Sequence, residues 1–449
     1  MIIQPARRVR GRLRLPGDKS ISHRTALLAA AARGRTRITN YATSEDCAST
    51  LACLRQLGVH VRREGTSVTI SGKGLSFPAA PPVPLNCGNS GTTMRLLAGL
   101  LAGQPFTSTL SGDDSLRSRP MRRIIEPLEQ MGARVNSTDG RAPLRVEGRR
   151  SLRPINYELP VASAQVKSCI LLAGLNAAGR TEIVERDAPT RDHTERLLRW
   201  FGVEVETELK TSADGDGALK SRHVVALEGG QELTARDVEV PGDISSAAFF
   251  LAAAALLPGS DLTIEGVGLN PTRTHILDAL RDFGAEISIV ERRREAGGEE
   301  AGDLRGRDGD LSGRGLDGEA ARAILSGEQI AGLIDELPIL AVVGSQLAGG
   351  LEIRDAAELR VKETDRISAT VANLRAMGAE VEERDDGMLV GGPSRLRGAR
   401  LDARGDHRIA MAFTVAALSA EGPSEIDGAD CVRISFPEFY TMLDSLVER

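Results

Sequence analysis

A sixfold internal repeat limits what this chain can fold into more than any other feature of its sequence. Each copy reads as a helix of small apolar residues, a break that contains glycine, and a short strand-like stretch. The copies begin about 70 to 90 residues apart, which indicates one structural unit repeated along the chain. The six copies are Ser22–Thr39, Gly91–Leu110, Ala164–Ile183, Ser245–Ile264, Asp335–Ile353 and His407–Ile426.

A second, amphipathic helix follows each copy, and five of these helices end at a glycine within a near-identical phrase. Glycine is the expected stop because it adopts the left-handed backbone conformation at little cost. With the strands that follow, each unit reads as βαβαββ. Six such units in 449 residues predict an α/β protein with two domains of three units each. The five glycines are Gly58, Gly132, Gly202, Gly284 and Gly378.

The joint between the two domains is expected near residues 235–242, between the third and fourth copies, where a polar stretch ends in Pro241-Gly242. One segment, residues 291–318, departs from the repeat because it is rich in Gly, Arg, Asp and Glu and has little apolar periodicity. Such a composition predicts a solvated loop.

Composition excludes several classes of protein. The longest apolar run, Ala247–Leu257, has 11 residues, against the roughly 20 that a membrane-spanning helix needs. The 57 basic and 62 acidic residues give a net charge of −5, whereas nucleic-acid binders usually carry a basic excess. Five cysteines without paired spacing argue against a disulfide framework and fit a reducing cytosol. Cys and His show no zinc-binding spacing either.

The N-terminus has one feature of a signal peptide, a basic stretch over residues 7–14 that precedes the apolar run Thr25–Ala32. The phrase PGDK at 16–19 separates the two parts, and the apolar run belongs to the first repeat copy. We therefore expect a cytoplasmic protein.

Polar and cationic side chains gather where the repeat helices begin. Three such starts in the first half are PGDKSISHR at 16–24, NSGTTMR at 89–95 and SAQVK at 163–167. A helix N-terminus exposes unpaired N–H groups and the positive end of the helix dipole, so each start is a potential anion site. Each one alone could also be an N-cap beside a surface base, but several that converge with Lys and Arg would bind a multiply anionic ligand.

The second half carries cations and carboxylates together before its repeat helices, in VKETDR at 361–366, GDHR at 405–408 and Asp335-Glu336. On a helix, Lys362 and Arg366 would share one face with Glu363 beside them, either as functional groups or as a solvated charge face. Carboxylates such as Asp335 and Glu363 among cations can stay ionised and still exchange protons, as acid–base catalysis requires.

Together, PGDKSISHR, NSGTTMR, LRSRPM at 116–121, VKETDR and GDHR resemble the enolpyruvyl transferases, in order and along essentially the whole chain. The resemblance implies two domains, each a pseudo-threefold arrangement of βαβαββ units, that close over the substrates. It places the N-terminal strand in the second domain, so that 14–235 form the first domain and 1–13 with 236–449 the second. The implied reaction transfers the enolpyruvyl group of phosphoenolpyruvate to the 5-hydroxyl of shikimate 3-phosphate and releases phosphate, in the shikimate pathway to chorismate and the aromatic amino acids.

The resemblance also implies site residues, no cofactor, no metal, and a monomer whose partners are these two small molecules rather than nucleic acid or a membrane. The positions that match shikimate 3-phosphate contacts are Lys19, Ser20, Arg24, Ser163, Ala164, Gln165, Arg191, Asp335 and Lys362. Those that match phosphoenolpyruvate contacts are Lys19, Gly91, Arg119, Gln165, Arg366 and Arg408. Asp335 matches the residue that takes the proton from the 5-hydroxyl, and Glu363 matches a carboxylate implicated in proton transfer to the phosphoenolpyruvate methylene. Lys19 and His407 complete the implied catalytic set.

The chain departs from many members of the family at a few positions. The pattern SAQ followed by Lys167, together with Arg191, is similar to a second sequence class of the family. A phosphoenolpyruvate-site lysine of other members aligns with Ile434, in a stretch expected to be a strand, and its replacement is left unassigned.

Two alternative functions remain open from the sequence. The first is the sister enzyme that transfers enolpyruvate to UDP-N-acetylglucosamine, whose mobile loop normally carries a cysteine that residues 112–120 lack. The second is a non-catalytic anion-binding relative, which would be expected to have lost Lys19, Asp335 or Glu363, and all three are present.

Overall fold

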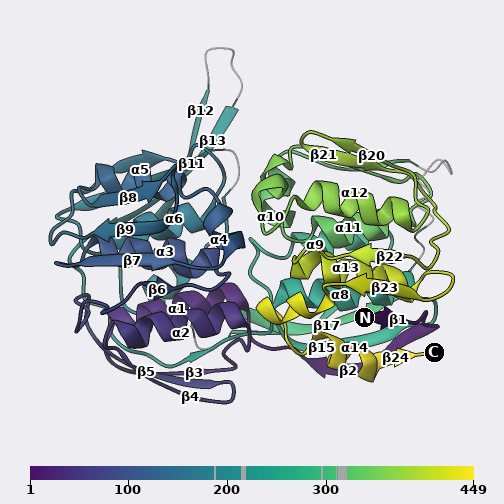
Figure 1. Ribbon diagram of the computed structural model, residues 1–449, viewed down its shortest axis with the longest axis horizontal. Coiled ribbons are helices and arrows are strands. Elements are labelled where there is room, and N and C mark those ends of the chain that lie inside the picture. Colours follow the sequence, from purple (N-terminus) through teal and green to yellow (C-terminus); the bar gives the residue numbers. More distant parts are fainter. Residues whose placement is uncertain (187–188, 214–218, 295–296, 310, 312–320) are drawn as a thin grey trace. The chain divides into compact units, whose positions relative to one another are not determined.

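The chain forms two compact units. The computed structural model describes residues 1–186, 189–213, 219–294, 297–309, 311 and 321–449 (Figure 1). The N-terminal unit comprises Gly17–Val240 and Arg294–Glu299, and the C-terminal unit comprises Met1–Pro16, Pro241–Arg293 and Glu300–Arg449. These boundaries fall at 16/17 and 240/241, compared with the expected 13/14 and 235/236, and they add residues 294–299 to the N-terminal unit.

Among the residues that the structure describes, the N-terminal unit contains three four-stranded sheets of identical topology. In each, a short edge strand runs parallel to its neighbour, and the remaining two strands are antiparallel. The strand β12 and its partner β13 extend beyond the other elements of this unit in Figure 1. In spatial order, the sheets are β14 (Val238–Glu239), β3 (Arg33–Thr39), β5 (Ser67–Lys73) and β4 (His60–Glu64); β6 (Leu85–Asn86), β7 (Thr107–Ser111), β9 (Arg141–Glu147) and β8 (Arg134–Thr138); and β10 (Asn156–Glu158), β11 (Arg180–Arg186), β13 (Leu219–Glu228) and β12 (Val205–Ala213).

Three helices fill the interior of this unit, α1 (Lys19–Ala31), α3 (Gly91–Ala102) and α6 (Ala164–Gly174). They are buried on nearly every side because most of their residues are apolar or small, and the buried charged ones, such as Arg24 and Lys167, are hydrogen-bonded. The backbones of α3 and α6 approach closely, since a Cβ on Gly99 would lie 2.3 Å from the carbonyl oxygen of Cys169. The remaining helices are the amphipathic α2 (Glu45–Gln56), α5 (Arg122–Gln130) and α7 (His193–Trp200), and the short α4 (Asp114–Ser118).

The C-terminal unit repeats this plan and incorporates the start of the chain. Strand β2 runs parallel to β15 with Thr263 opposite Arg12, and β1 pairs with β23. The sheets are β18 (Ala323–Leu325), β19 (Leu351–Ile353), β21 (Gly387–Val390) and β20 (Val381–Arg384); β16 (Glu286–Arg294), β17 (Glu300–Arg307), β15 (Asp261–Gly268), β2 (Arg8–Arg14) and β24 (Val447–Glu448); and β1 (Ile2–Ile3), β23 (Ser424–Asp427) and β22 (Arg400–Asp402).

Buried helices again form the interior of the C-terminal unit, and they are α8 (Ile244–Leu256), α11 (Leu337–Gly344) and α13 (His407–Leu418). Phe249 and Phe250 of α8 pack edge-to-face against Phe439 of α14, with ring centroids 6.0 and 5.8 Å apart. The other helices are α9 (His275–Asp282), α10 (Glu328–Leu333), α12 (Arg366–Ala376), α14 (Phe439–Leu446), and the 3₁₀ helices η1 (Ala357–Val361) and η2 (Ala429–Ile434).

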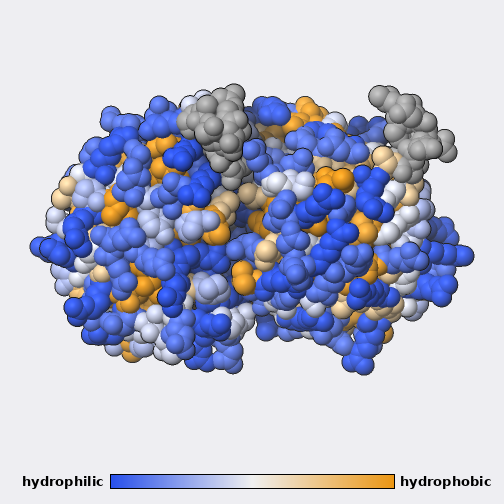
Figure 2. All heavy atoms as spheres, turned by 90° about the horizontal axis from the view of Figure 1, so that it is seen from above, coloured by the Kyte–Doolittle hydropathy of each residue, from blue (hydrophilic) through white to orange (hydrophobic). Residues whose placement is uncertain are grey.

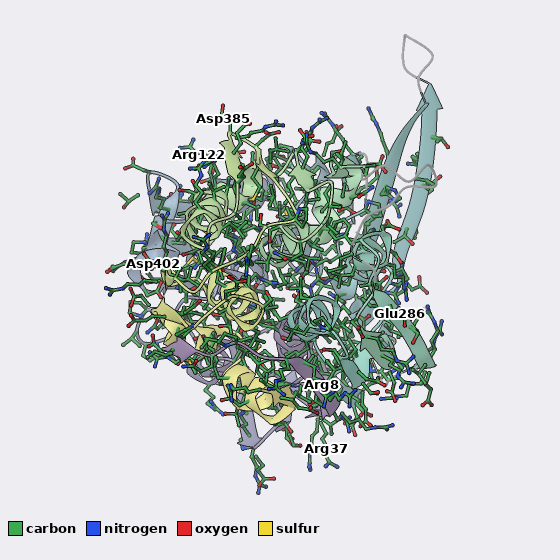
Figure 3. The ribbon with its side chains drawn as sticks, turned by 90° about the vertical axis from the view of Figure 1, so that its right-hand side faces the viewer. Arg8, Arg37, Arg122, Glu286, Asp385 and Asp402 are labelled. Carbon is green, nitrogen blue, oxygen red and sulfur yellow. The ribbon has the colours of Figure 1, made fainter. Side chains whose placement is uncertain are left out.

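Charged side chains cover the outer faces of both units. Arg37 of β3, Glu286 of β16 and Asp402 of β22 lie at the periphery in Figure 3. Each is exposed, whereas the next residue after Arg37 or Glu286 is buried, as strand alternation requires. The face in Figure 2 is mostly hydrophilic, with hydrophobic side chains in small scattered groups. Within the described part of the chain, no helix is both long and apolar enough to cross a membrane.

The predicted fold class and helix ends are confirmed. All five glycines that were expected to stop the second helices have a positive φ, between +80° and +98°. Each follows a helix C-cap directly, for example Gly58 after Leu57 of α2 and Gly378 after Met377 of α12. The left-handed conformation therefore ends the helices for the reason that the sequence indicated.

Three local predictions were wrong. Part of the segment 291–318, which was expected to be a solvated loop, belongs to the strands β16 and β17, while residues 295–296, 310 and 312–318 lie outside the described part. Glycines on the buried face hide the alternation in β17, because a Cβ on Gly302 or Gly306 would lie 2.6 or 2.8 Å from leucine side chains. Lys362 is not helical, since α12 begins only at Arg366. The stretch around Ile434 is the helix η2 and not a strand.

Candidate active site

In the N-terminal unit, the three buried helices begin with capped N-termini. The side chains of Asp18, Ser90 and Ser163 each accept a hydrogen bond from the backbone N–H three residues on, at 2.9, 3.0 and 3.4 Å. Such a cap fixes the first turn, and the helix dipole still presents its positive end there. The predicted residues Lys19, Ser20, Gly91, Ala164 and Gln165 all lie in these first turns.

The first turns of α3 and α6 are joined through Gln165. Its amide nitrogen donates to Thr92 Oγ1 at 2.9 Å, and its amide oxygen accepts from Arg95 Nη1 at 2.5 Å. A Cβ on Gly91 would lie 2.8 Å from Arg95 Nη1 and 3.5 Å from Arg119 Nη1. Two guanidinium groups therefore lie close to the backbone at Gly91, an arrangement that suits a small anion.

Arg119 is oriented by its own loop. Its Nη2 donates to Asn89 Oδ1 at 2.7 Å and to Ser115 Oγ at 3.1 Å. The Arg119 side chain is buried, so these neutral acceptors hold it without neutralising its charge. These contacts tie Arg119 to the residue before the N-cap of α3 and to the short helix α4.

Arg24 connects α1 to α6 and α7. Its Nε donates to Thr194 Oγ1 at 2.8 Å, its Nη2 to Ser168 Oγ at 3.0 Å, and its Nη1 to the Ser20 carbonyl at 3.0 Å. Burial and then the nearby charge of Arg191 lower the pKa of Arg24 to about 10, so that it is still cationic near neutral pH. Lys19 Nζ, at the start of the same helix, donates to Asp46 Oδ2 at 3.0 Å.

A buried chain of hydrogen bonds ties the N-terminal turns of α1 and α3 to the middle of α2. His23 Nδ1 lies 2.6 Å from Thr50 Oγ1, which lies 2.7 Å from Thr93 Oγ1, which in turn lies 2.8 Å from Ser90 Oγ. Burial, followed by the charges of Lys19 and Arg24, lowers the pKa of His23 well below its usual value. His23 is therefore a neutral structural link rather than a charged ligand.

In the C-terminal unit, three carboxylates surround the guanidinium of Arg366. Its Nε donates to Asp406 Oδ2 at 2.8 Å, its Nη2 to Glu363 Oε2 at 2.7 Å, and its Nη1 to Asp335 Oδ1 at 3.3 Å. Arg366 is 1% exposed, and although burial opposes its charge, the three carboxylates raise its pKa. The side chains of Asp335 and Glu363 stay 16% and 17% exposed, so both can reach a bound molecule.

Arg408 lies beside the same carboxylates, at the start of α13. Its Nη1 donates to the Asp335 carbonyl at 2.8 Å, and its Nη2 lies 3.7 Å from Asp335 Oδ2. Asp406 caps this helix by accepting from Arg408 N at 2.8 Å, and His407 between them is buried. One buried carboxylate, Asp406, thus bonds both the guanidinium of Arg366 and the backbone of Arg408.

Lys362 lies on the irregular stretch before α12. Burial lowers its pKa, and the carboxylates of Asp335 and Glu358 oppose that shift. Its Nζ is 4.0 Å from Glu358 Oε1. The charge of Asp335 therefore acts on Lys362, whereas the helical face that Lys362 was predicted to share with Arg366 does not form.

A second buried network contacts Arg408 through the carboxylate of Glu336. Glu336 Oε1 lies 3.4 Å from both Arg408 Nη1 and Arg273 Nη2, and Ser245 Oγ bonds to Glu336 and Arg273.

Within the described residues, no group of three or more His, Cys, Asp or Glu side chains could hold a metal ion.

The family assignment follows from comparison with known proteins. Residues 3–443 match the sequence model of the family described as EPSP synthase (3-phosphoshikimate 1-carboxyvinyltransferase). The chain belongs to the EPSP synthase family.

Individual relatives agree with this assignment to the EPSP synthase family. A 3-phosphoshikimate 1-carboxyvinyltransferase of Koribacter versatilis is 50% identical over 448 residues, covering 100% of this chain and 99% of the relative. One of Geobacter sp. is 47% identical over 449 residues, with 100% and 99% coverage. A solved EPSP synthase from Acinetobacter baumannii superposes with a TM-score of 0.83 at 38% identity, covering 99% of this chain and 97% of that one. These matches favour the first predicted activity over transfer to UDP-N-acetylglucosamine.

This EPSP synthase family member gathers its predicted site residues in two sets, one in each unit. The N-terminal unit carries Lys19, Ser20, Arg24, Gly91, Arg119, Ser163, Ala164, Gln165 and Arg191, and the C-terminal unit carries Asp335, Lys362, Glu363, Arg366, His407 and Arg408. Sequence reasoning gave no role to Arg95, His23 and Asp406, although all three lie inside the quoted motifs. A polar residue on a buried helix face, as at Arg95, was the available signal.

Proposed function

We propose that this chain transfers the enolpyruvyl group of phosphoenolpyruvate to the 5-hydroxyl of shikimate 3-phosphate and releases inorganic phosphate. The observation that carries the proposal is Arg366, which holds two partly exposed carboxylates, Asp335 and Glu363, beside a second arginine, Arg408. This arrangement pairs acid–base groups with cations for an anionic substrate, as the reaction requires.

The N-terminal unit supplies anion-binding groups in this proposal. Shikimate 3-phosphate is held by Lys19, Ser20, Arg24, Ser163, Ala164, Gln165 and Arg191. Phosphoenolpyruvate is held by Lys19, Gly91, Arg119 and Gln165, with Arg95 beside Gly91 and Gln165. The support comes from the convergence of two helix N-termini at Gln165 and from the cationic state of Arg24.

The C-terminal unit supplies the proton transfers. Asp335 takes the proton of the 5-hydroxyl while the hydroxyl oxygen bonds to C2 of phosphoenolpyruvate. Glu363 delivers a proton to C3. The tetrahedral adduct then loses a proton from C3 as the bond from C2 to the phosphate oxygen breaks, which restores the double bond and frees phosphate. Arg366 and Arg408 neutralise the phosphoenolpyruvate anion, with Lys362 and His407 as supporting contacts.

The remaining expectations belong to the same proposal. The enzyme acts in the cytoplasm as a monomer on these two small molecules. Gel filtration with light scattering tests the monomer, because a dimer would double the expected 47.8 kDa.

The decisive experiment measures phosphate release with shikimate 3-phosphate and phosphoenolpyruvate, each omitted in turn. Asp335→Asn should lower kcat by at least about 100-fold, the usual minimum for a general base. The matched control is Asp385→Asn, which removes the same charge from an exposed turn. Release that needs only one substrate, or that survives equally in Asp335→Asn and the control, would overturn the proposal.

A further inference from the structure

A buried ionic triad lies in the N-terminal unit, close in sequence to Gln165 and Arg191, which are assigned to shikimate 3-phosphate. Lys167 Nζ lies 2.8 Å from Glu185 Oε2 and 2.8 Å from Glu195 Oε1. The three side chains are 1%, 2% and 1% exposed. Burying three charged groups costs desolvation free energy, and apolar residues of similar volume would often be as stable. The triad is therefore a candidate for a role beyond stability.

The triad binds both the backbone N–H and the backbone carbonyl of one loop residue, Thr190. Glu185 Oε1 accepts from Thr190 N at 3.0 Å and also from its hydroxyl, while Lys167 Nζ donates to the Thr190 carbonyl at 3.1 Å. The next residue along the chain is Arg191. The triad therefore fixes the position of the backbone immediately before Arg191.

The other side of Arg191 is held by the same helices. Glu195 stands in the first turn of α7, and its neighbour Thr194 contacts Ser168 Oγ at 2.7 Å and Arg24 Nε at 2.8 Å. Lys167 and Ser168 are adjacent in α6, so the ionic contact and the hydroxyl contact join α6 to α7 side by side. Residues 190 and 194–195 are thus fixed on both flanks of Arg191.

The charge state of the triad suits a rigid support. Burial opposes the charge of Lys167, but the two carboxylates raise its pKa, so it stays protonated. Burial raises the pKa of Glu195, and Lys167 opposes that shift. An ammonium with three donors can bind both carboxylates and the Thr190 carbonyl at once, and no apolar side chain could replace all three contacts.

We propose that Lys167 is a positioning residue that, through Glu185 and Glu195, sets Arg191 for the phosphate of shikimate 3-phosphate. The inference rests on the proposed function and extends it to a residue that does not touch substrate. It predicts that loss of the ammonium weakens recognition of the phosphate group in particular, and not of the cyclohexene ring or of phosphoenolpyruvate.

The test compares binding of shikimate 3-phosphate with binding of shikimate, which lacks the phosphate, by calorimetry. Lys167→Met keeps the length of the side chain, and Lys167→Met/Glu195→Gln restores the net charge of the triad to its original −1. Each should weaken shikimate 3-phosphate binding by roughly tenfold or more, the scale of a lost charged hydrogen bond, and shikimate binding by less than about twofold. Lys73→Met, at an exposed lysine, is the control for the charge change.

A double-mutant cycle with Arg191→Ala separates positioning from general stability. If Lys167 acts through Arg191, Arg191→Ala should cost much less in the Lys167→Met/Glu195→Gln background than in the wild type. Additive losses, or equal weakening of both ligands, would overturn the inference. So would failure of both triad variants to fold by circular dichroism, which would assign the triad to stability of the unit. Phosphate release by the wild type is measured alongside, and its failure would instead refute the proposed function.

Discussion

Removal of the Asp406 carboxylate should separate the two arginines of the C-terminal unit from their common support. Asp406 is fully buried and accepts from Arg366 Nε at 2.8 Å, from Arg366 Nη2 at 3.3 Å and from Arg408 N at 2.8 Å. Asp406→Ala therefore removes one partner of a buried ion pair and the N-cap of α13 in a single step.

The expected loss of stability follows from these contacts. A hydrogen bond to a charged group contributes about 1.5–3 kcal/mol, and an N-cap contributes about 1 kcal/mol. Stranding the Arg366 charge brings the total loss in the free energy of unfolding to about 3–5 kcal/mol, the range for breaking a buried pair. Asp406→Asn keeps an oxygen for the cap and loses the charge, so it should lose about 1 kcal/mol less.

Urea unfolding, followed by far-ultraviolet circular dichroism, measures the loss, and phosphate release at saturating shikimate 3-phosphate measures the KM for phosphoenolpyruvate. Because Arg366 and Arg408 both lose their support, that KM should rise in both variants. The control is Asp385→Ala at an exposed turn. A loss for Asp406→Ala within about 0.5 kcal/mol of the control, the ordinary surface range, would refute the reasoning.

Two further predictions concern the N-terminal unit. Gly91→Ala should raise the KM for phosphoenolpyruvate and leave the KM for shikimate 3-phosphate nearly unchanged, because the new methyl would lie 2.8 Å from Arg95 Nη1. Steady-state kinetics with each substrate varied in turn measures both constants, and an equal rise in the two KM values would contradict the prediction. His23 has a native pKa well below its unfolded value, so the unfolded state binds the extra proton and stability should fall as the pH drops below about 6.5. His23→Gln should flatten that fall in urea unfolding between pH 5 and 7.5, whereas His60→Gln, at an exposed histidine, should leave it unchanged.

The residues differ in how far the sequence could predict them. Gly58 and Gly378 end helices because a left-handed residue is needed immediately after the C-cap, and that need is visible within a few positions. The strand β17 was missed because its buried face carries Gly302 and Gly306 on either side of Leu304, and glycine carries little hydrophobic signal. Lys362 was placed on a helix because spacing alone does not reveal that Asp365 caps α12 after it.

What the sequence determined by itself is the repeated unit, the ends of its helices and the motifs at the helix starts. These depend on periodicity, caps and turn residues, which act over a few positions. Only the tertiary structure decided which side chains meet: Gln165 lies against Arg95, and Arg366 binds an aspartate 40 residues away. Such contacts follow from how closely buried helices pack, as at Gly99, because packing brings together groups that no local pattern relates.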